Sequence, residues 1–201
     1  QIYWANSQYD PLGRVTQMDE PAPHGTRNII NTSYSGLTTM VTSGSEQRQK
    51  TTVTNAIGQV IHRAEEEGSY IDYTYTADGN LKTTTVAGDS TTTITLSYDE
   101  FGRKIAMDDP DMGQWSYTYN AFGQLISQTD AKNQTTTMAY DILGRMTSRT
   151  EAEGTSTWVY GDHTAPQGSI GKLLSETNAG ITKTYFYDSF GRPDEVTTDI
   201  T

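Results

Sequence analysis

Apolar and polar residues alternate along much of the chain with a period of two. Ile94, Leu96 and Tyr98 alternate with hydroxyl residues at 93, 95 and 97, and the same alternation returns at 115–119 and 158–160. This period predicts β-strands that each have one packed face. No segment has a sustained helical period, so we expect almost no helix.

The strand-like stretches are joined by a six-residue motif of the form Tyr-Asp-x-x-Gly-Arg, which recurs along the chain. Five good copies begin at residues 9, 98, 119, 140 and 187, and weaker copies begin at 54 and 75. The glycines at 58, 79, 102, 123 and 144 are spaced by 21, 23, 21 and 21 residues. The chain is therefore predicted to be a repeat protein with a unit of about 21 residues.

Each copy has the residues that a hairpin turn requires. Asp or Asn favours the first position of a type I turn, because its side chain accepts hydrogen bonds from backbone N–H groups further round the turn. A Gly three positions later supplies the left-handed residue that forms a bulge. The motif residues that we expect to form these turns are Tyr9, Asp10, Gly13, Arg14, Asn55, Gly58, Tyr75, Gly79, Tyr98, Asp99, Gly102, Arg103, Tyr119, Asn120, Gly123, Tyr140, Asp141, Gly144, Arg145, Tyr187, Asp188, Gly191 and Arg192.

One other position of the unit has a recurrent character. The residue before Gly is usually apolar, as at Leu12, Ile57, Phe101, Phe122, Leu143 and Phe190. We expect these hairpin tips to pack on one another. The arginines of the motif are expected to lie over tyrosine rings or to pair with the turn carboxylates, which stabilises an exposed pair by less than about 1 kcal/mol.

The motif, its spacing and the Thr-rich strands between its copies resemble the YD-repeat, or RHS-repeat, family, over essentially the whole chain. The resemblance implies an all-β array of stacked hairpins that forms a curled or spiralling antiparallel sheet. In that family the sheet is a shell around an enclosed polypeptide, often a C-terminal toxin. Relatives include the B and C components of Tc toxins, RHS effectors and teneurins.

The family's C-terminal self-cleavage element is not matched. Its Asp-Pro-x-Gly-Leu core would have to lie at 109–113, where Asp109-Pro110-Asp111-Met112-Gly113 is followed by Gln114 and an ordinary repeat. Autoproteolysis is therefore not expected of this chain.

The composition limits the partners that the array can bind. The net charge of −11 opposes binding to nucleic acids and anionic membranes, and no membrane-inserting run or targeting segment is present. Hydrophobic residues make up 33% of the chain, so a thick core is not expected. Disorder is the alternative at this composition, but the spaced aromatics and regular turns favour a fold.

The whole chain, residues 1–201, is predicted to be one repeat array, excised from a much larger shell protein because it begins and ends within the pattern. Loops are predicted at 20–28, where prolines block ladder bonds, and at 161–171, where the glycine spacing stretches to 27. A divergent hairpin around Ser35 and Gly36 fills the place of a missing copy. An array cut in this way exposes edge strands, so self-association of the fragment is expected.

No residue pattern predicts catalysis, a metal site or a cofactor. His24, His62 and His163 have no metal-ligand spacing, and 108–113 lacks the distal Glu of a calcium loop. The sequence Gly161-Asp162-His163 has no partner serine in a local signature. We expect no enzyme activity.

The first functional hypothesis is a structural segment of a secreted or cell-surface bacterial shell, with the rest of the shell and its cargo as partners. The alternative is an extracellular adhesion or carbohydrate-binding module that uses Trp115 or Trp158. A glycoside hydrolase ranks last, because any carboxylate pair could be chosen among 25 Asp and Glu.

Overall fold

The computed structural model describes residues 4–22, 27–44, 48–65 and 68–200. The chain forms two compact units. The first comprises Gln1–Ser97 with Asp109–Asp111, and the second comprises Tyr98–Asp108 with Met112–Thr201.

Eighteen strands are present among the described residues, all in antiparallel sheet. In chain order they are β1 (Asn6–Tyr9), β2 (Val15–Pro21), β3 (Arg27–Ser35), β4 (Thr38–Ser43), β5 (Arg48–Thr54), β6 (Val60–Glu65), β7 (Tyr70–Tyr75), β8 (Leu81–Val86), β9 (Ile94–Tyr98), β10 (Lys104–Asp109), β11 (Gly113–Tyr119), β12 (Leu125–Thr129), β13 (Thr135–Tyr140), β14 (Met146–Glu151), β15 (Gly154–Tyr160), β16 (Leu173–Asn178), β17 (Ile181–Tyr187) and β18 (Pro193–Ile200). One 3-10 turn, η2 (Ser90–Thr92), is the helical element of the described chain. The predicted all-β class of stacked hairpins, with almost no helix, is confirmed.

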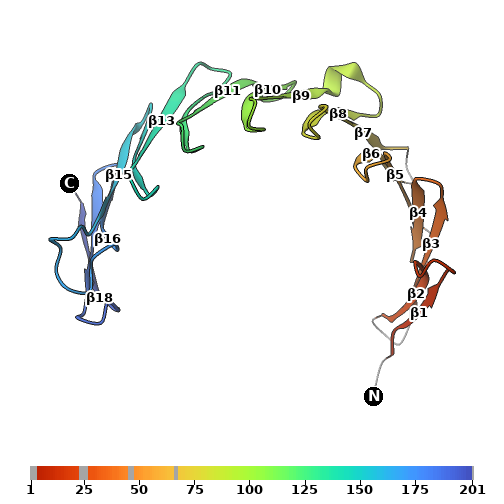
Figure 1. Ribbon diagram of the computed structural model, residues 1–201, viewed down its shortest axis with the longest axis horizontal. Helices are drawn as coiled ribbons and strands as arrows, with labels where there is room; N and C mark the ends of the chain where they lie inside the picture. Colours follow the sequence, from red (N-terminus) through yellow and green to blue (C-terminus); the bar gives the residue numbers. More distant parts are fainter. Residues whose placement is uncertain (1–3, 23–26, 45–47, 66–67, 201) are drawn as a thin grey trace. The chain divides into compact units, whose positions relative to one another are not determined.

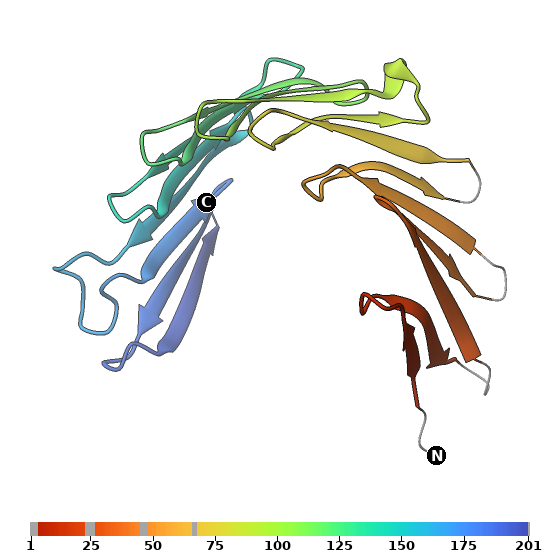
Figure 2. The ribbon, with the colours of Figure 1, turned by 45° about the vertical axis from the view of Figure 1, so that its right-hand side comes forward.

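Each strand pairs with the next one along the chain. In the first unit this holds from β1 to β9, and in the second from β11 to β18, so each unit is a meander of hairpins side by side. Figure 1 shows β11 to β18, from green to blue, as one layer of strands, and Figure 2 shows the hairpins of the first unit in the same way. None of the described helical residues forms a segment with the length and apolarity needed to cross a membrane.

Strand alternation and register separate the two faces of the second unit. The aromatic face carries Trp115, Tyr117, Tyr119, Tyr140, Trp158, Tyr160, Tyr185 and Tyr187. On the opposite threonine face, hydroxyls meet directly across neighbouring strands, with Oγ1–Oγ1 distances of 2.9 Å for Thr129 and Thr135 and 3.0 Å for Thr150 and Thr155. The Thr-rich composition is thus explained by cross-strand pairs on one face.

No hydrophobic side chain in the described part of the chain is fully buried. The accessible surface is 13860 Å², whereas a compact monomer of 201 residues would expose about 9,400 Å². A single layer of strands accounts for the difference, because a sheet that lacks a second layer covers neither face.

The prediction that the hairpin tips pack on one another is wrong. Leu12 is 76% exposed, Ile57 77%, Phe101 81%, Phe122 90% and Phe190 83%. Neighbouring tips lie two strands apart, about 9.6 Å, which is too far for apolar side chains that point outward from the turn to cover one another.

The predicted loop at 20–28 is shorter than expected. Glu20 and Pro21 continue β2 and pair with Asn28 and Arg27 of β3. Pro21 is tolerated because it is the last residue of its strand. Residues 23–26, including His24, lie outside the described residues. The loop predicted at 161–171 lies between β15 and β16, with a bridge between Gly161 and Ile170.

Candidate functional site

The recurrent turn is built around the side chain of its aspartate. In the copy at 140–145, Oδ1 of Asp141 accepts the backbone N–H of Leu143 and of Arg145, both at 2.9 Å. Oδ2 accepts Nε of Arg145 at 2.7 Å. One carboxylate thus fixes both the bend and the arginine. The same three bonds recur at Asp10, Asp99 and Asp188.

Asn and Gln form a neutral version of the same turn. Oδ1 of Asn120 accepts the N–H of Phe122 and of Gln124, both at 3.0 Å, and its Nδ2 donates to Oε1 of Gln124 at 2.6 Å. Asn55 and Gln59 repeat this arrangement. The copy at 75–80 uses Oγ1 of Thr76 as its acceptor.

The glycine closes the turn in a left-handed conformation. Gly144 has φ of 81° and donates its N–H to the carbonyl of Asp141 at 3.0 Å, and Gly58, Gly79, Gly102 and Gly123 have φ between 76° and 87°. Next to the turns of Gly58, Gly79, Gly123 and Gly144 the strand register shifts at the first residue of the motif, for example between Ala139 and Tyr140. This shift is the bulge that the glycine was expected to produce.

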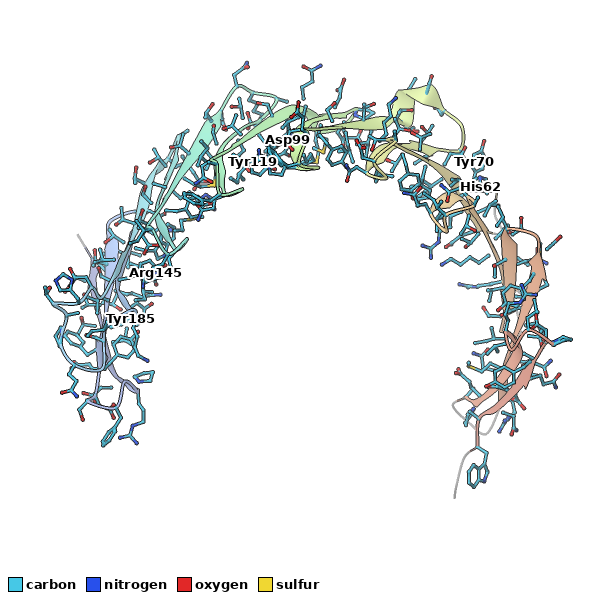
Figure 3. All side chains as sticks on the ribbon, in the orientation of Figure 1. His62, Tyr70, Asp99, Tyr119, Arg145 and Tyr185 are labelled. Atoms are coloured by element: carbon cyan, nitrogen blue, oxygen red, sulfur yellow. The ribbon has the colours of Figure 1, made fainter. Side chains whose placement is uncertain are left out.

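The residue after the glycine reaches into the next repeat. Nη1 of Arg103 donates to the carbonyl of Asn120 at 3.1 Å, and its Cζ lies 4.9 Å from the ring centroid of Tyr119. Arg145 donates to the carbonyl of Gly171 at 2.8 Å and lies 4.2 Å from the ring of Tyr160. Each guanidinium therefore donates to the aspartate of its own turn and also connects that turn to the following one. Figure 3 labels Asp99, Tyr119 and Arg145.

The motif tyrosine makes a contact that sequence reasoning missed. Its hydroxyl donates to the backbone carbonyl of the residue two after the glycine in the preceding copy. The donor and acceptor pairs are Tyr75 with Val60 at 2.7 Å, Tyr119 with Lys104 at 2.8 Å, Tyr140 with Leu125 at 2.9 Å, and Tyr187 with Leu173 at 2.9 Å. Tyr34, in the divergent hairpin, makes the same bond to the carbonyl of Val15 at 3.1 Å. The constant separation of 15 residues in three of these pairs is the sequence signal that could have revealed it.

Two further motif tyrosines lie at the ends of strands. Tyr9 ends β1 and is 62% exposed, and Tyr98 ends β9.

The weaker copy at 54–59 contacts the hairpin before it. Asn55 follows Thr54, whose backbone N–H donates to the carbonyl of Leu37 at 3.0 Å. Leu37 belongs to the predicted divergent hairpin, so this hairpin contacts the next repeat through its backbone.

The turn aspartates are held in their charged form. The backbone N–H of Arg14 lowers the pKa of Asp10, and the N–H of Arg192 does the same for Asp188. Burial raises the pKa of Asp99 and Asp141, but the N–H and guanidinium groups of Arg103 and Arg145 outweigh it, so their pKa also lies below the ordinary value. Hydrogen bonds to the carboxylate favour ionisation.

An eighth copy of the turn is interrupted by the insertion at 162–169. The N–H of Gly161 donates to the carbonyl of Lys172 at 2.8 Å, and the N–H of Gly171 donates to the carbonyl of Gly161 at 2.7 Å. These are the backbone bonds that Asp and Gly make in other copies. A Cβ at 161 would lie 2.2 Å from the carbonyl oxygen of Ser169, so an Asp cannot occupy this position.

A similar turn at the opposite edge of the second unit was not predicted. Oδ1 of Asp130 accepts the N–H of Lys132 and of Gln134, and Asn133 takes the place of the glycine with φ of 61°. The sequence analysis missed this turn because it identified turns by their glycines, and this turn has none. Asn is the residue other than Gly that most readily adopts this conformation.

The histidines occupy separate environments. Nδ1 of His62 lies 2.7 Å from Oδ1 of Asp72, its cross-strand partner, and its ring lies 5.2 Å from that of Tyr70 (Figure 3). His163 is exposed in the insertion.

The turn at 108–113, which was compared with a calcium loop, is closed by its own aspartate. Between β10 and β11, the N–H of Asp111 donates to Oδ1 of Asp109 at 2.8 Å. The described residues contain no group of three His, Cys, Asp or Glu arranged to hold a metal ion.

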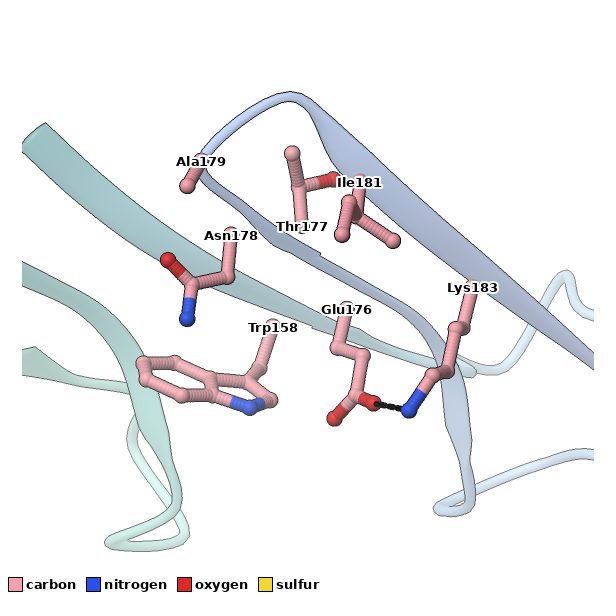
Figure 4. A pocket seen from close by; sticks show the side chains of 7 residues that line it. All are labelled: Trp158, Glu176, Thr177, Asn178, Ala179, Ile181 and Lys183. Atoms are coloured by element: carbon pink, nitrogen blue, oxygen red, sulfur yellow. Dashed lines mark ion pairs between the residues drawn. The ribbon is translucent and has the colours of Figure 1, made fainter. Parts of the chain in front are cut away.

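A cavity of about 310 Å³ opens on the aromatic face beside Trp158. Figure 4 shows the indole lying next to Asn178 and the carboxylate of Glu176. Oε1 of Glu176 lies 3.4 Å from Nζ of Lys183 and accepts the hydroxyl of Tyr185 at 2.9 Å. That hydrogen bond raises the pKa of Tyr185. Trp115 lines a separate cavity of about 290 Å³.

Known proteins share the family pattern and the fold. The model of the RHS Repeat family matches residues 114–156. The crystal structure of TcdB2-TccC3 without its hypervariable C-terminal region aligns with a TM-score of 0.79 at 13% identity, over 98% of this chain and 11% of that chain. The crystal structure of TcdB2-TccC3-Cdc42 aligns with a TM-score of 0.61 at 14% identity, over 98% of this chain and 14% of that chain. The search of the curated proteins found no match.

At these identities the structural likeness is one of fold, and this chain spans only 11% and 14% of the length of the two structures. The repeat-to-repeat bonds described above show what the motif residues do locally. The resemblance inferred from the motif is confirmed at residues 114–156, where the model of the RHS Repeat family matches this chain.

Proposed function

We propose that this chain is a wall section of an RHS-type shell that encloses or delivers another polypeptide, and that its role is non-enzymatic. The observation that supports this proposal best is the single layer of the sheet, which leaves the aromatic face of the second unit only partly buried. No hydrophobic side chain of the described residues is buried, so this surface contacts something outside the sheet or remains wet.

The aromatic face suits an enclosed polypeptide better than one rigid ligand. Tyr119, Tyr140 and Tyr187 use their hydroxyls in bonds between hairpins, so their partly buried rings are held in place. Tyrosine rings offer an amphipathic surface that accommodates varied sequences. The two similar crystal structures are of TcdB2-TccC3, one of them without its hypervariable C-terminal region and the other with Cdc42. We extend this association, and a secreted or cell-surface location, to the present chain as part of the proposal.

The test is mass spectrometry of the native polypeptide, combined with limited proteolysis. We expect a polypeptide several times longer than 201 residues, in which a further segment resists protease in the intact protein and is digested once denaturant opens the repeats. A purified repeat array that lacks such a protected segment, or a segment digested equally fast in both conditions, would contradict the proposal.

A second candidate, glycan binding, is favoured by the cavity beside Trp158. An indole face flanked by Asn178, Glu176 and Lys183 combines stacking with hydrogen-bonding groups, which small-ligand sites commonly use. If glycans bind there, Trp158→Ala abolishes a fluorescence or calorimetric signal from soluble oligosaccharides, while Trp115→Ala retains it. Equal signals from both variants would remove this candidate.

A further inference from the structure

The apolar hairpin tips of the second unit lie along one edge of its sheet. Turns that follow odd-numbered strands all lie at the same edge of an antiparallel meander, and each places an apolar residue just before its glycine. We call these residues the tip row: Phe101, Phe122, Leu143, Ile170 and Phe190.

The tip row is continuous, because neighbouring turns bond to each other. Arg103 contacts the turn of Asn120, Arg145 contacts Gly171, and Nζ of Lys172 donates to the carbonyl of Gly191 at 2.6 Å. The hairpins of Phe122 and Leu143 are joined by the bond from the Tyr140 hydroxyl to the carbonyl of Leu125. The tips are therefore held about 9.6 Å apart, twice the spacing of adjacent strands. A fixed apolar row with this period is matched tip for gap by another surface with the same period, and a second copy of this chain supplies one.

The gap between the first two tips, Phe101 and Phe122, is large enough to receive a side chain. Phe101, Phe122 and Arg103, with Ala121 and Gly123, line a cavity of about 480 Å³. An aromatic side chain entering this gap would contact two phenyl rings on either side. Rows with the same spacing can therefore interdigitate, as knobs enter holes in other packed interfaces.

The exposed area is sufficient for a stable interface. Phe101, Phe122 and Phe190 are 81%, 90% and 83% exposed, which amounts to about 500 Å² of aromatic surface from these three alone. Leu143 and Ile170, at 70% and 58%, add to it. Two such rows facing each other would bury more than about 1,200 Å², the lower limit for specific interfaces.

The charges beside the tips are self-complementary. Asp99 with Arg103, Asp141 with Arg145 and Asp188 with Arg192 place one acid and one base beside three of the tips. The side chain of Arg192 is 73% exposed and its guanidinium lies 5.3 Å from the Phe190 ring. Two rows related by a two-fold axis bring bases toward acids, whereas the net charge of −11 disfavours an anionic membrane.

We propose that the tip row is a self-docking surface, on which a second copy of this chain seats its own tip row in an antiparallel, two-fold arrangement. In this arrangement the two-fold axis passes beside Leu143, the third of five tips, so the Leu143 side chains of the two copies lie next to each other. Phe101 of one copy faces the region of Phe190 of the other.

Sedimentation equilibrium of the 201-residue chain tests this proposal over a range of concentrations. The chain is expected to dimerise, and Phe101→Ser/Phe122→Ser/Phe190→Ser is expected to raise the dissociation constant by more than about a hundredfold. The matched control is Val159→Ser/Phe186→Ser, which removes residues that are 51% and 45% exposed within strands and should leave dimerisation unchanged. A chain that is monomeric throughout, or a control that loses the dimer as fully as the tip variant, overturns the proposal.

A cross-linking experiment covers the case in which the triple variant does not fold. The chain contains no cysteine, so a single one can be introduced as a probe. Leu143→Cys is expected to form a covalent dimer under mild oxidation, whereas Lys132→Cys, in an exposed turn at the opposite edge, is not. Cross-linking of Lys132→Cys at the same rate or faster overturns the two-fold arrangement, and so does the absence of any Leu143→Cys cross-link.

Discussion

The hydroxyl of Tyr140 donates to the backbone carbonyl of Leu125 at 2.9 Å, and so joins the hairpin of β13 and β14 to the one before it. The acceptor is the backbone of a residue whose side chain is apolar. The carbonyl of Leu125, the first residue of β12, thereby receives a hydrogen bond from the following repeat. Because the same bond recurs along the chain, the motif tyrosine stabilises contacts between repeats as well as the turn in which it lies.

Tyr140→Phe should therefore lower the free energy of unfolding by about 1 kcal/mol, since the Leu125 carbonyl loses its partner while the ring stays. Urea titration followed by circular dichroism would measure the change. Tyr117→Phe is the control, because no hydroxyl hydrogen bond is described for Tyr117, and it should have little effect. Equal losses from the two variants would show that the ring environment, and not the bond, matters.

Gly123→Ala should destabilise the chain by about 1–2 kcal/mol, because Gly123 has φ of 82° and an L-residue is strained there. No atom lies within 4 Å of the added Cβ, so the cost is conformational and not steric. Gly123→Asn should cost less, since Asn133 occupies the same position of the opposite turn at φ of 61°. Thermal unfolding of the two variants distinguishes them, and a larger loss for Asn than for Ala would disprove the explanation.

Stability should fall as the pH drops below about 4. The pKa of Asp141 is lower in the folded chain than the ordinary value of about 3.9, because Arg145 donates to its carboxylate despite the opposing effect of burial. A carboxyl with a lowered folded pKa contributes fully above its unfolded pKa, and that contribution is lost as pH falls through the folded pKa.

Asp141→Asn/Arg145→Gln tests this pH dependence, because it copies the neutral turn of Asn120 and Gln124. Urea midpoints between pH 7 and pH 2 should decline less for this variant than for the parent chain. Changing Asp130, on the opposite edge and without a described ion pair, to Asn serves as the comparison. A parent chain whose midpoint is flat below pH 4 would refute the linkage.

The insertion at 162–169 should be removable. Replacing residues 161–171 with Asp-Ile-Leu-Gly, the sequence at 141–144, restores an uninterrupted turn before Lys172. Closing the shorter loop costs about 1 kcal/mol less in conformational entropy, and this difference offsets the lost contacts of the insertion. The variant should keep its circular dichroism spectrum and unfold within a few degrees of the parent. Replacement with four alanines should be clearly less stable, and if it is not, the turn residues are not what closes this hairpin.

Much of the fold was determined by the sequence. The alternation at 94–98 predicted strands because a pleated strand sends successive side chains to opposite faces. The motif at 140–145 predicted a turn with a bulge, since Asp141 and Gly144 satisfy requirements that act within six residues. The spacing of 21 residues then predicted stacking, because one hairpin cannot bury its own face.

Contacts between repeats were decided by the tertiary structure. The bond from Tyr140 to Leu125 joins residues that local turn chemistry does not relate, and the sequence shows an apolar side chain where a backbone carbonyl is used. The tips were predicted to pack together because they are apolar, but the strand spacing sets Phe101 and Phe122 too far apart. Gly161 could be identified as a turn residue only when the chain had brought Lys172 back beside it. Local conformational rules can be read residue by residue, whereas distances between hairpins follow from how the sheet pairs in three dimensions.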